Sequence, residues 1–139
     1  MRKRVLTSAI SFILICSLFT SLALAATLRA SKYISSYNAV IYSSGNEITV
    51  DCSITGTGRM KTIGIKSVKI YTSSGTNVAT YSYTTDGYEY LMGSDTGRKT
   101  ESVTYTGTSG KSYYAVVVFY ASDGSGGDSR SYTTKTITV

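Results

Sequence analysis

The stretch from Lys111 to Ala121, KSYYAVVVFYA, constrains the fold of this chain more than any other feature. It is the longest apolar run outside the N-terminal region, and it consists mainly of β-branched and aromatic residues. Its length and composition are typical of a strand and argue against a helix. We therefore expect a central β-strand that is buried on both faces, with the other elements arranged around it.

Residues 1–25 have the pattern of an export signal. The basic residues Arg2–Arg4 precede a mostly apolar stretch that ends in a small-x-small cleavage site at Ala23–Ala25. We expect cleavage before Ala26, which leaves residues 26–139 as one exported domain without a membrane span. A retained membrane anchor is the alternative, and the polar residues and cleavage site of the stretch disfavour it.

Charge and cysteine content limit the kinds of partner and of covalent cross-link that the exported chain can have. After cleavage, 11 basic and 8 acidic residues remain, a net charge of +3, and the basic residues form no run. A solvated surface explains this charge better than nucleic-acid binding does. Cys52 is then the only cysteine, so no internal disulfide can form. Its apolar neighbours in the same phase predict a buried thiol, with a Cys52–Cys52 dimer as the alternative.

Short strands separated by turns account for the rest of the exported chain. The clearest alternation is in Glu47–Thr55, where four apolar residues share one face. Arg59–Ile65 is expected to be irregular, and Asp86–Arg98 is expected to be a long connection. The predicted strands are Ser31–Tyr42, Glu47–Thr55, Lys66–Thr72, Val78–Thr84, Lys99–Thr106, Lys111–Ala121 and Arg130–Val139. Seven short strands without helical periodicity indicate an antiparallel sandwich or barrel.

The passage from Gly107 to Ser129 resembles the sixth strand and following hairpin of fibronectin type III and other immunoglobulin-like domains. It contains a tyrosine after a turn, an alternating strand that ends in alanine, and then a glycine-rich loop. The resemblance implies a seven-stranded antiparallel immunoglobulin-like β-sandwich with Tyr113 or Tyr114 as the corner tyrosine, Tyr113 being favoured. The whole pattern also resembles small secreted single-domain proteins of Gram-positive bacteria that have no assigned activity, which implies an extracellular location, free or at the cell surface.

Residues for catalysis are scarce. The chain contains no histidine, which removes the commonest general base and metal ligand and leaves Cys52 without an activator. The carboxylates show no spacing that suggests a glycosidase pair. The loop Asp123–Asp128 offers two carboxylates, too few for calcium, and its composition is typical of a hairpin. We expect no enzymatic activity, no metal site and no cofactor.

Tyrosine is the one unusual feature of the composition, with 13 residues against a single phenylalanine, Phe119, after cleavage. The simplest explanation is that tyrosine serves as the large residue of a tryptophan-free sandwich. The functional explanation is an amphipathic contact surface, because tyrosine has one apolar and one polar end. The candidate contact residues are Tyr81, Tyr83, Tyr88 and Tyr90.

These four tyrosines are predicted to lie on an edge strand and on the connection that leaves it. There they would form a flat aromatic platform, with three carboxylates nearby to orient a ligand. Those carboxylates are Asp86, Glu89 and Asp95. The alternative is that Tyr88, Leu91 and Met92 only close the open end of the sandwich.

Two functional hypotheses follow. The first is a non-enzymatic, secreted binding or adhesion module that contacts a glycan or a protein through surface tyrosines. The second is a structural subunit that assembles with copies of itself through the edge strands of the sandwich. Size-exclusion chromatography of the exported protein separates these two hypotheses.

Overall fold

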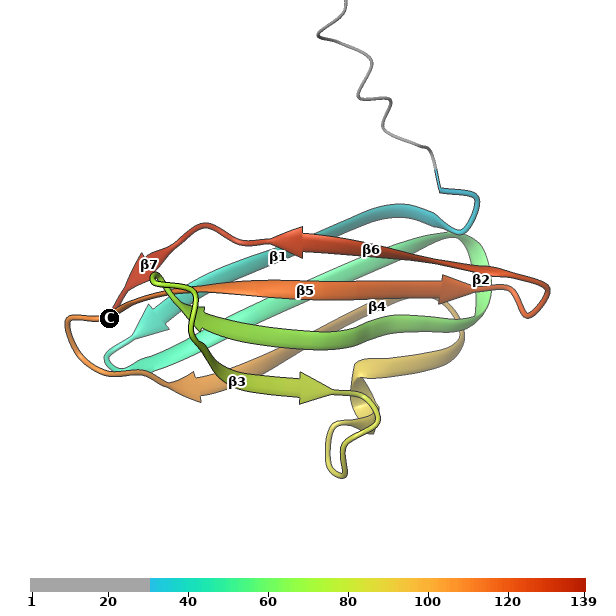
Figure 1. Cartoon of the computed structure of the whole chain (residues 1–139). Coiled ribbons are helices and arrows are strands. Elements are labelled where there is room, and N and C mark those ends of the chain that lie inside the picture. The colour runs from blue at the N-terminus through green and yellow to red at the C-terminus, as the bar shows by residue number, and fades with distance from the viewer. Residues whose placement is uncertain (1–30) are drawn as a thin grey trace, which may run out of the picture.

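Seven antiparallel strands and one short 3₁₀ helix make up residues 31–139, the part of the chain that this computed structural model describes (Figure 1). The signal peptide predicted at residues 1–25 and the predicted cleavage before Ala26 lie outside the described residues. Within them, no helix is long and apolar enough to cross a membrane. The elements are β1 (Ile34–Ser44), β2 (Glu47–Thr72), β3 (Asn77–Ser82), η1 (Glu89–Leu91), β4 (Met92–Thr106), β5 (Ser112–Ser122), β6 (Gly127–Thr133) and β7 (Ile137–Thr138).

Strand β2 is 26 residues long and connects the two halves of the fold. Its first half lies between β1 and β4, and its second half pairs with β3 and β5. The prediction of two separate strands was therefore wrong, although the pairing of β2 is irregular around the expected segment Arg59–Ile65, with register shifts between Thr55 and Met60 and between Ile65 and Ser67. The glycines at positions 56 and 64 let the strand bend without interrupting it, because a Cβ at either position would collide with neighbouring atoms of Met60 or of the backbone at residues 91–92.

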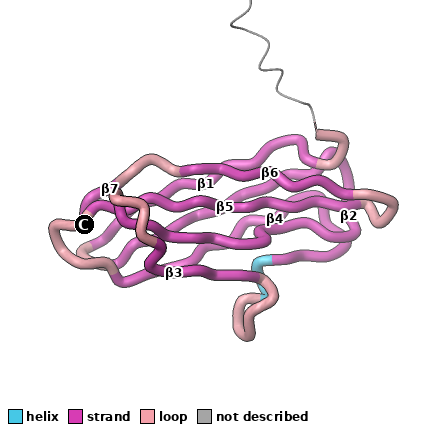
Figure 2. Tube along the Cα trace, viewed as in Figure 1, coloured by secondary structure: helices cyan, strands magenta, loops and turns pink. Residues whose placement is uncertain are grey.

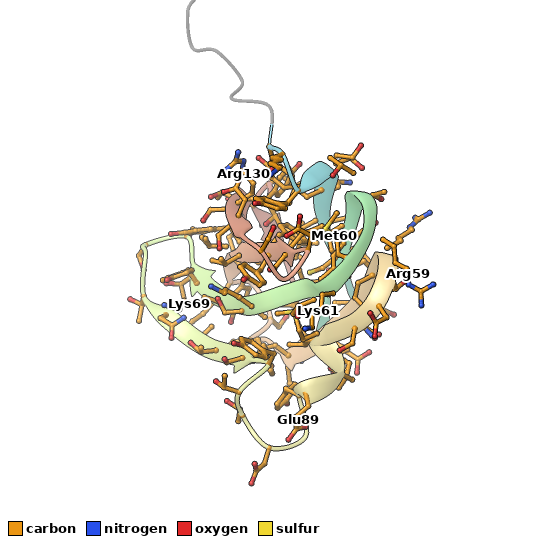
Figure 3. The ribbon with its side chains drawn as sticks, turned by 90° about the vertical axis from the view of Figure 1, so that its right-hand side faces the viewer. Arg59, Met60, Lys61, Lys69, Glu89 and Arg130 are labelled. Atoms are coloured by element: carbon orange, nitrogen blue, oxygen red, sulfur yellow. The ribbon has the colours of Figure 1, made fainter. Side chains whose placement is uncertain are left out.

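The bend of β2 folds the sheet over into two layers around one core (Figures 1 and 3). One layer has the order β1, first half of β2, β4; the other has the order β3, second half of β2, β5, β6. The ring of Tyr37 on β1 contacts Phe119 on β5 at a centroid distance of 5.5 Å, which joins the layers. All-β antiparallel architecture is thus confirmed, and most of the described chain is strand (Figure 2).

The core contains the alternating apolar residues that the sequence predicts. The inward residues of β2 are buried, including Cys52 at 1% exposure. Met60, Ile63 and Ile65, from the segment that was expected to be irregular, are buried as well. Arg59, between Gly58 and Met60, is exposed and points away from the molecule (Figure 3). The period-two pattern is interrupted at the bend, where residues 57–59 are all exposed and residues 63–65 are all buried, and it resumes at Val68.

Two connections differ from the prediction. Residues 86–98 were expected to be one long loop, but the chain forms η1 and then enters β4 at Met92. The expected closing strand Arg130–Val139 is divided into β6, which begins at Gly127, and β7. The count of seven strands is correct, but only because two predicted strands are joined in β2 and one predicted strand is divided between β6 and β7.

Strand β5 is buried on one face only, so the prediction of burial on both faces was wrong. Its odd-numbered residues from Tyr113 to Ala121 face the core and are buried. Its even-numbered residues, from Tyr114 to Tyr120, are half-exposed on the outer face of the layer. The physical reason is that no element of the described chain packs over this face, so β5 is central in its sheet but not between layers.

Candidate functional site

The four candidate tyrosines lie at the side of the sandwich formed by β3 and β4. Tyr81 is near the end of β3 and Tyr83 lies just beyond it. Tyr88 directly precedes η1, and Tyr90 lies within it. Strand β3 pairs only with β2, so the prediction that this segment lies at a sheet edge is confirmed.

Three of these rings contact one another and form a group that we call the tyrosine cluster (Tyr81, Tyr88 and Tyr90). The Tyr81 and Tyr88 centroids are 5.2 Å apart with a 57° tilt, and those of Tyr88 and Tyr90 are 6.1 Å apart with a 38° tilt. These distances are typical of favourable aromatic pairs. The tilts mean that the cluster is faceted and not the flat platform predicted. Tyr83 packs against the core and makes no ring contact with the cluster in the described residues.

Two hydroxyls of the cluster donate hydrogen bonds to the edge of β4. Tyr81 donates to the carbonyl of Thr104 at 2.7 Å, and Tyr90 donates to the carbonyl of Ser102 at 3.2 Å. These carbonyls lie on the free side of β4. The N–H of Gly107 donates to the carbonyl of Asn46, which directly precedes β2. In an antiparallel pair, every second residue directs its N–H and carbonyl groups toward the partner strand. Odd-numbered residues of β4 therefore bond to β2, and even-numbered residues direct their carbonyls away from it. The cluster therefore covers an edge that would otherwise present unpaired acceptors.

The phenols of Tyr81 and Tyr90 are held in their neutral form. Burial, followed by the proximity of Tyr88, raises the pKa of both Tyr81 and Tyr90 above the usual value of tyrosine. A neutral phenol keeps its proton and can donate, which is what the two carbonyl acceptors require. The two hydrogen bonds fix the ring positions, while the ring of Tyr90 remains 42% exposed.

The carboxylates predicted to assist the site are distributed unevenly. Glu89 lies within η1, next to Tyr90, and accepts a hydrogen bond from the N–H of Gly87 at 2.9 Å (Figure 3). Asp86 is exposed in the same loop. Asp95 lies on β4 with a positive φ of 53°, and among the described residues it makes no contact with the cluster. Two of the three carboxylates therefore accompany the tyrosines.

A second pair of tyrosines on the sheet face was not predicted. Tyr71 of β2 and Tyr114 of β5 are direct partners in the strand register, and their rings stack at 5.3 Å with an angle of 13°. Tyr120, further along the same face of β5, carries Lys66 over its ring at 4.5 Å. The sequence does contain the residues of this surface, since they are the even-numbered residues of β5. They could be recognised as an outer face only once the structure showed that β5 is covered on one side.

Elsewhere in the described residues, no buried side-chain nitrogen or oxygen lacks a hydrogen-bond partner. No group of three or more His, Cys, Asp or Glu side chains comes together in residues 31–139. Burial, and then the charge of Asp51, raise the pKa of the Cys52 thiol to about 12, so it is protonated at neutral pH. Asp123 accepts hydrogen bonds from Ser125 and Gly126 of its own loop, which lower its pKa and fit the predicted hairpin.

In comparisons with known proteins, no family model matches this chain, and no curated protein matches it at a significant level. Any proposal for the function therefore rests on the geometry of the described residues.

Proposed function

We infer that the domain is an immunoglobulin-like sandwich of the fibronectin type III kind. The arrangement in three- and four-stranded layers supports this, as does the glycine-rich hairpin after β5. A further support is the hydroxyl of Tyr113, which bonds back to the turn before β5 in the manner of a corner tyrosine, whereas Tyr114 faces outward. The continuous β2 replaces the loop that usually separates two strands of such a domain.

We propose that the protein is a non-enzymatic, extracellular binding module, and that the tyrosine cluster is its contact surface. The observation that carries this proposal is that the hydroxyls of Tyr81 and Tyr90 are fixed by β4 carbonyls while the Tyr90 ring stays exposed. Ordering a side chain on binding costs about 0.5–1.5 kcal/mol. Rings that are already ordered avoid most of that cost.

A glycan is the partner that we favour. A sugar ring presents C–H groups to an aromatic face and hydroxyls to its sides. The cluster supplies the aromatic faces, and the adjacent loop supplies acceptors in the carboxylates of Asp86 and Glu89. The faceted shape suits a bent chain or the end of a glycan better than a flat crystalline surface. The pattern of an export signal in residues 1–25 supports an extracellular partner.

The test is retention of the purified protein on immobilised cell-wall and mucin-type glycans. The double variant Tyr88→Ser with Tyr90→Ser is expected to lose retention and to keep most of its thermal stability, because neither residue belongs to the buried core. The matched control is Tyr114→Ser, which removes a half-exposed tyrosine from the outer face of β5. Equal loss in the control would contradict a local site.

Conservative variants separate the rings from the hydroxyls. Tyr90→Phe keeps the ring and frees the carbonyl of Ser102, so it should retain binding with a weaker affinity. If the double serine variant binds every glycan as the unmodified protein does, but a pull-down with it loses a protein partner, the partner is a protein and the glycan assignment is wrong.

A further inference from the structure

Strand β1 is a long strand edge whose one register irregularity lies at its start, between Ile34 and Ser36, so that residues 36–44 form a regular edge. It has 11 residues, none of them charged and none of them proline. Val40 and Tyr42 on its outer face are 47% and 46% exposed. Natural edge strands are commonly short, bulged or charged, because an open edge pairs readily with another chain.

The other three edges of the sandwich each carry protection. The edge of β4 is covered by the tyrosine cluster. On β6, Asp128 and Arg130 form an ion pair of 2.7 Å, and their register opposite Ala121 and Phe119 directs both charges toward the inner face. Inward-pointing charges are a known device against edge pairing. Strand β3 has only six residues and a register irregularity at its start.

The unpaired backbone groups of β1 follow from its register. Ser44 and Glu47 face each other across a two-residue loop, and such a closing pair exchanges backbone hydrogen bonds. Because bonding alternates along an antiparallel pair, the even-numbered residues of β1 bond to β2. The contact of Asn46 with Gly107 on the opposite side of β2 agrees with this phase. The odd-numbered residues therefore direct their N–H and carbonyl groups outward. These residues are Tyr37, Ala39, Ile41 and Ser43.

A shallow cleft runs beside this part of β1. Its volume is about 280 Å³, and one wall is formed by the backbone and side chains of residues 38–41. Tyr132, Thr134 and Lys135 form the opposite wall. Lys135 is the one charged residue of the lining, and its exposed, flexible side chain can keep its ammonium in water. Strand β1 pairs only with β2, so no other strand of the described chain occupies this edge.

We propose that β1 is a homodimer interface, at which the β1 strand of a second copy pairs antiparallel across a two-fold axis at Ile41. The outward groups are odd-numbered on both copies, so the pairing must place odd residues opposite odd residues. With the axis at Ile41, Val40 lies opposite Tyr42 of the second copy, and the reverse pair forms as well. Aromatic with β-branched residues make favourable cross-strand pairs.

The neutral character of β1 is what selects a second copy as the partner. A strand without charges can approach its own copy without repulsion, and each exposed apolar side chain gains an apolar cross-strand neighbour. Because the same patch is used on both subunits, the contact is self-complementary, and a dimer leaves no copy of the patch free to bind a third subunit. The expected assembly is a dimer and not a fibre, since a fibre needs a second open edge.

The test is sedimentation velocity of the purified exported protein over a range of concentrations. The unmodified protein is expected to show a monomer–dimer equilibrium. Val40→Asp and Tyr42→Lys should each raise the dissociation constant about tenfold, since each removes both cross-strand contacts between positions 40 and 42 and places two like charges on one face of the paired strands. The matched control is Thr100→Asp, because Thr100 is an exposed residue of β4 and lies outside the proposed interface. This variant should leave the dimer unchanged.

Mixing the two charged variants tests the register. In a mixed dimer, Asp at position 40 of one copy faces Lys at position 42 of the other, so the mixture should dimerise where each variant alone does not. Dimerisation of either variant alone at the concentration that suffices for the unmodified protein would overturn the proposal. A failure of the mixture would overturn the axis at Ile41.

A backbone variant separates strand pairing from side-chain contact. Ser43 directs its N–H away from β2, so Ser43→Pro removes no bond of the fold and should keep the melting temperature. It should abolish the dimer, because that N–H pairs with Ala39 of the second copy. A monomeric unmodified protein at every concentration, or a dimeric Ser43→Pro variant, would contradict pairing through β1.

Discussion

The hydroxyl of Tyr113 accepts a hydrogen bond from the backbone N–H of Thr108 across 2.9 Å. This bond ties the start of β5 to the turn that precedes it. The side chain is 2% exposed, and its ring lies 6.0 Å from that of Tyr105 on β4 in an edge arrangement. Donation from the N–H of Thr108 lowers the pKa of Tyr113 by favouring the charged form of the phenol. Tyr113 thus links both layers and the turn.

The first prediction concerns this bond. Tyr113→Phe should reduce the free energy of unfolding by about 0.5–1.5 kcal/mol, the net contribution of a typical hydrogen bond, while the ring packing is kept. Urea denaturation of the purified protein measures the change. The matched control is Tyr114→Phe, whose hydroxyl makes no hydrogen bond in the described part of the chain, and which should be neutral. An equal loss in both variants would show that Tyr113 is not a corner tyrosine.

The sequence predicted the core better than the connections, for a physical reason. Alternation identifies the face of a strand, so Cys52 and its neighbours on β2 were placed correctly. Glycines mark a change of direction without saying whether the strand is interrupted. At Gly56–Gly58 the chain bends and continues, and composition alone could not separate a bend from a loop.

The candidate site was predicted in part for a similar reason. Tyr81, Tyr88 and Tyr90 are close in sequence and at an edge, which the strand order could indicate. The acceptors that hold them, Ser102 and Thr104, are on another strand, and only the pairing of β4 with β2 reveals which carbonyls are free. The dimer edge required the same information, since it depends on the phase of β1 hydrogen bonds.

The second prediction concerns the central strand. Val117 is fully buried on β5 and lies opposite Val68 of β2. Val117→Asp should unfold the protein, because an unpaired buried charge costs several kcal/mol, which is comparable to the stability of a small domain. Circular dichroism with thermal melting measures this. Val118→Asp, on the half-exposed face of the same strand, is the control and should still melt cooperatively.

The third prediction concerns the packing at Gly64, where β2 pairs with both β4 and β5. A Cβ at this position would collide with the carbonyl oxygen of Leu91 and lie 2.8 Å from the Cα of Met92, both backbone atoms that cannot move aside cheaply. Gly64→Ala should therefore cost about 1–3 kcal/mol or more. Gly58→Ala has open space around its Cβ and is the matched control. Similar melting temperatures for the two variants would contradict the close approach of β4.

The last prediction concerns Cys52, whose thiol is buried beside the charge of Asp51. Burial first, and Asp51 second, raise its pKa from 9.0 to about 12. Above about pH 9, the unfolded chain loses the thiol proton and the folded chain keeps it, so the unfolded state binds fewer protons. The free energy of unfolding should then fall by about 1.4 kcal/mol per pH unit between the two pKa values.

Urea denaturation at about pH 8 and about pH 10.5 measures that slope. Cys52→Ala is the reference, because it lacks the thiol but keeps Tyr81 and Tyr90, whose raised pKa values act in the same direction. The unmodified protein should lose more stability than the variant over this interval. In addition, a thiol reagent at neutral pH should label Cys52 only after denaturation. Rapid labelling of the folded protein, or equal slopes in the two proteins, would place the thiol at the surface.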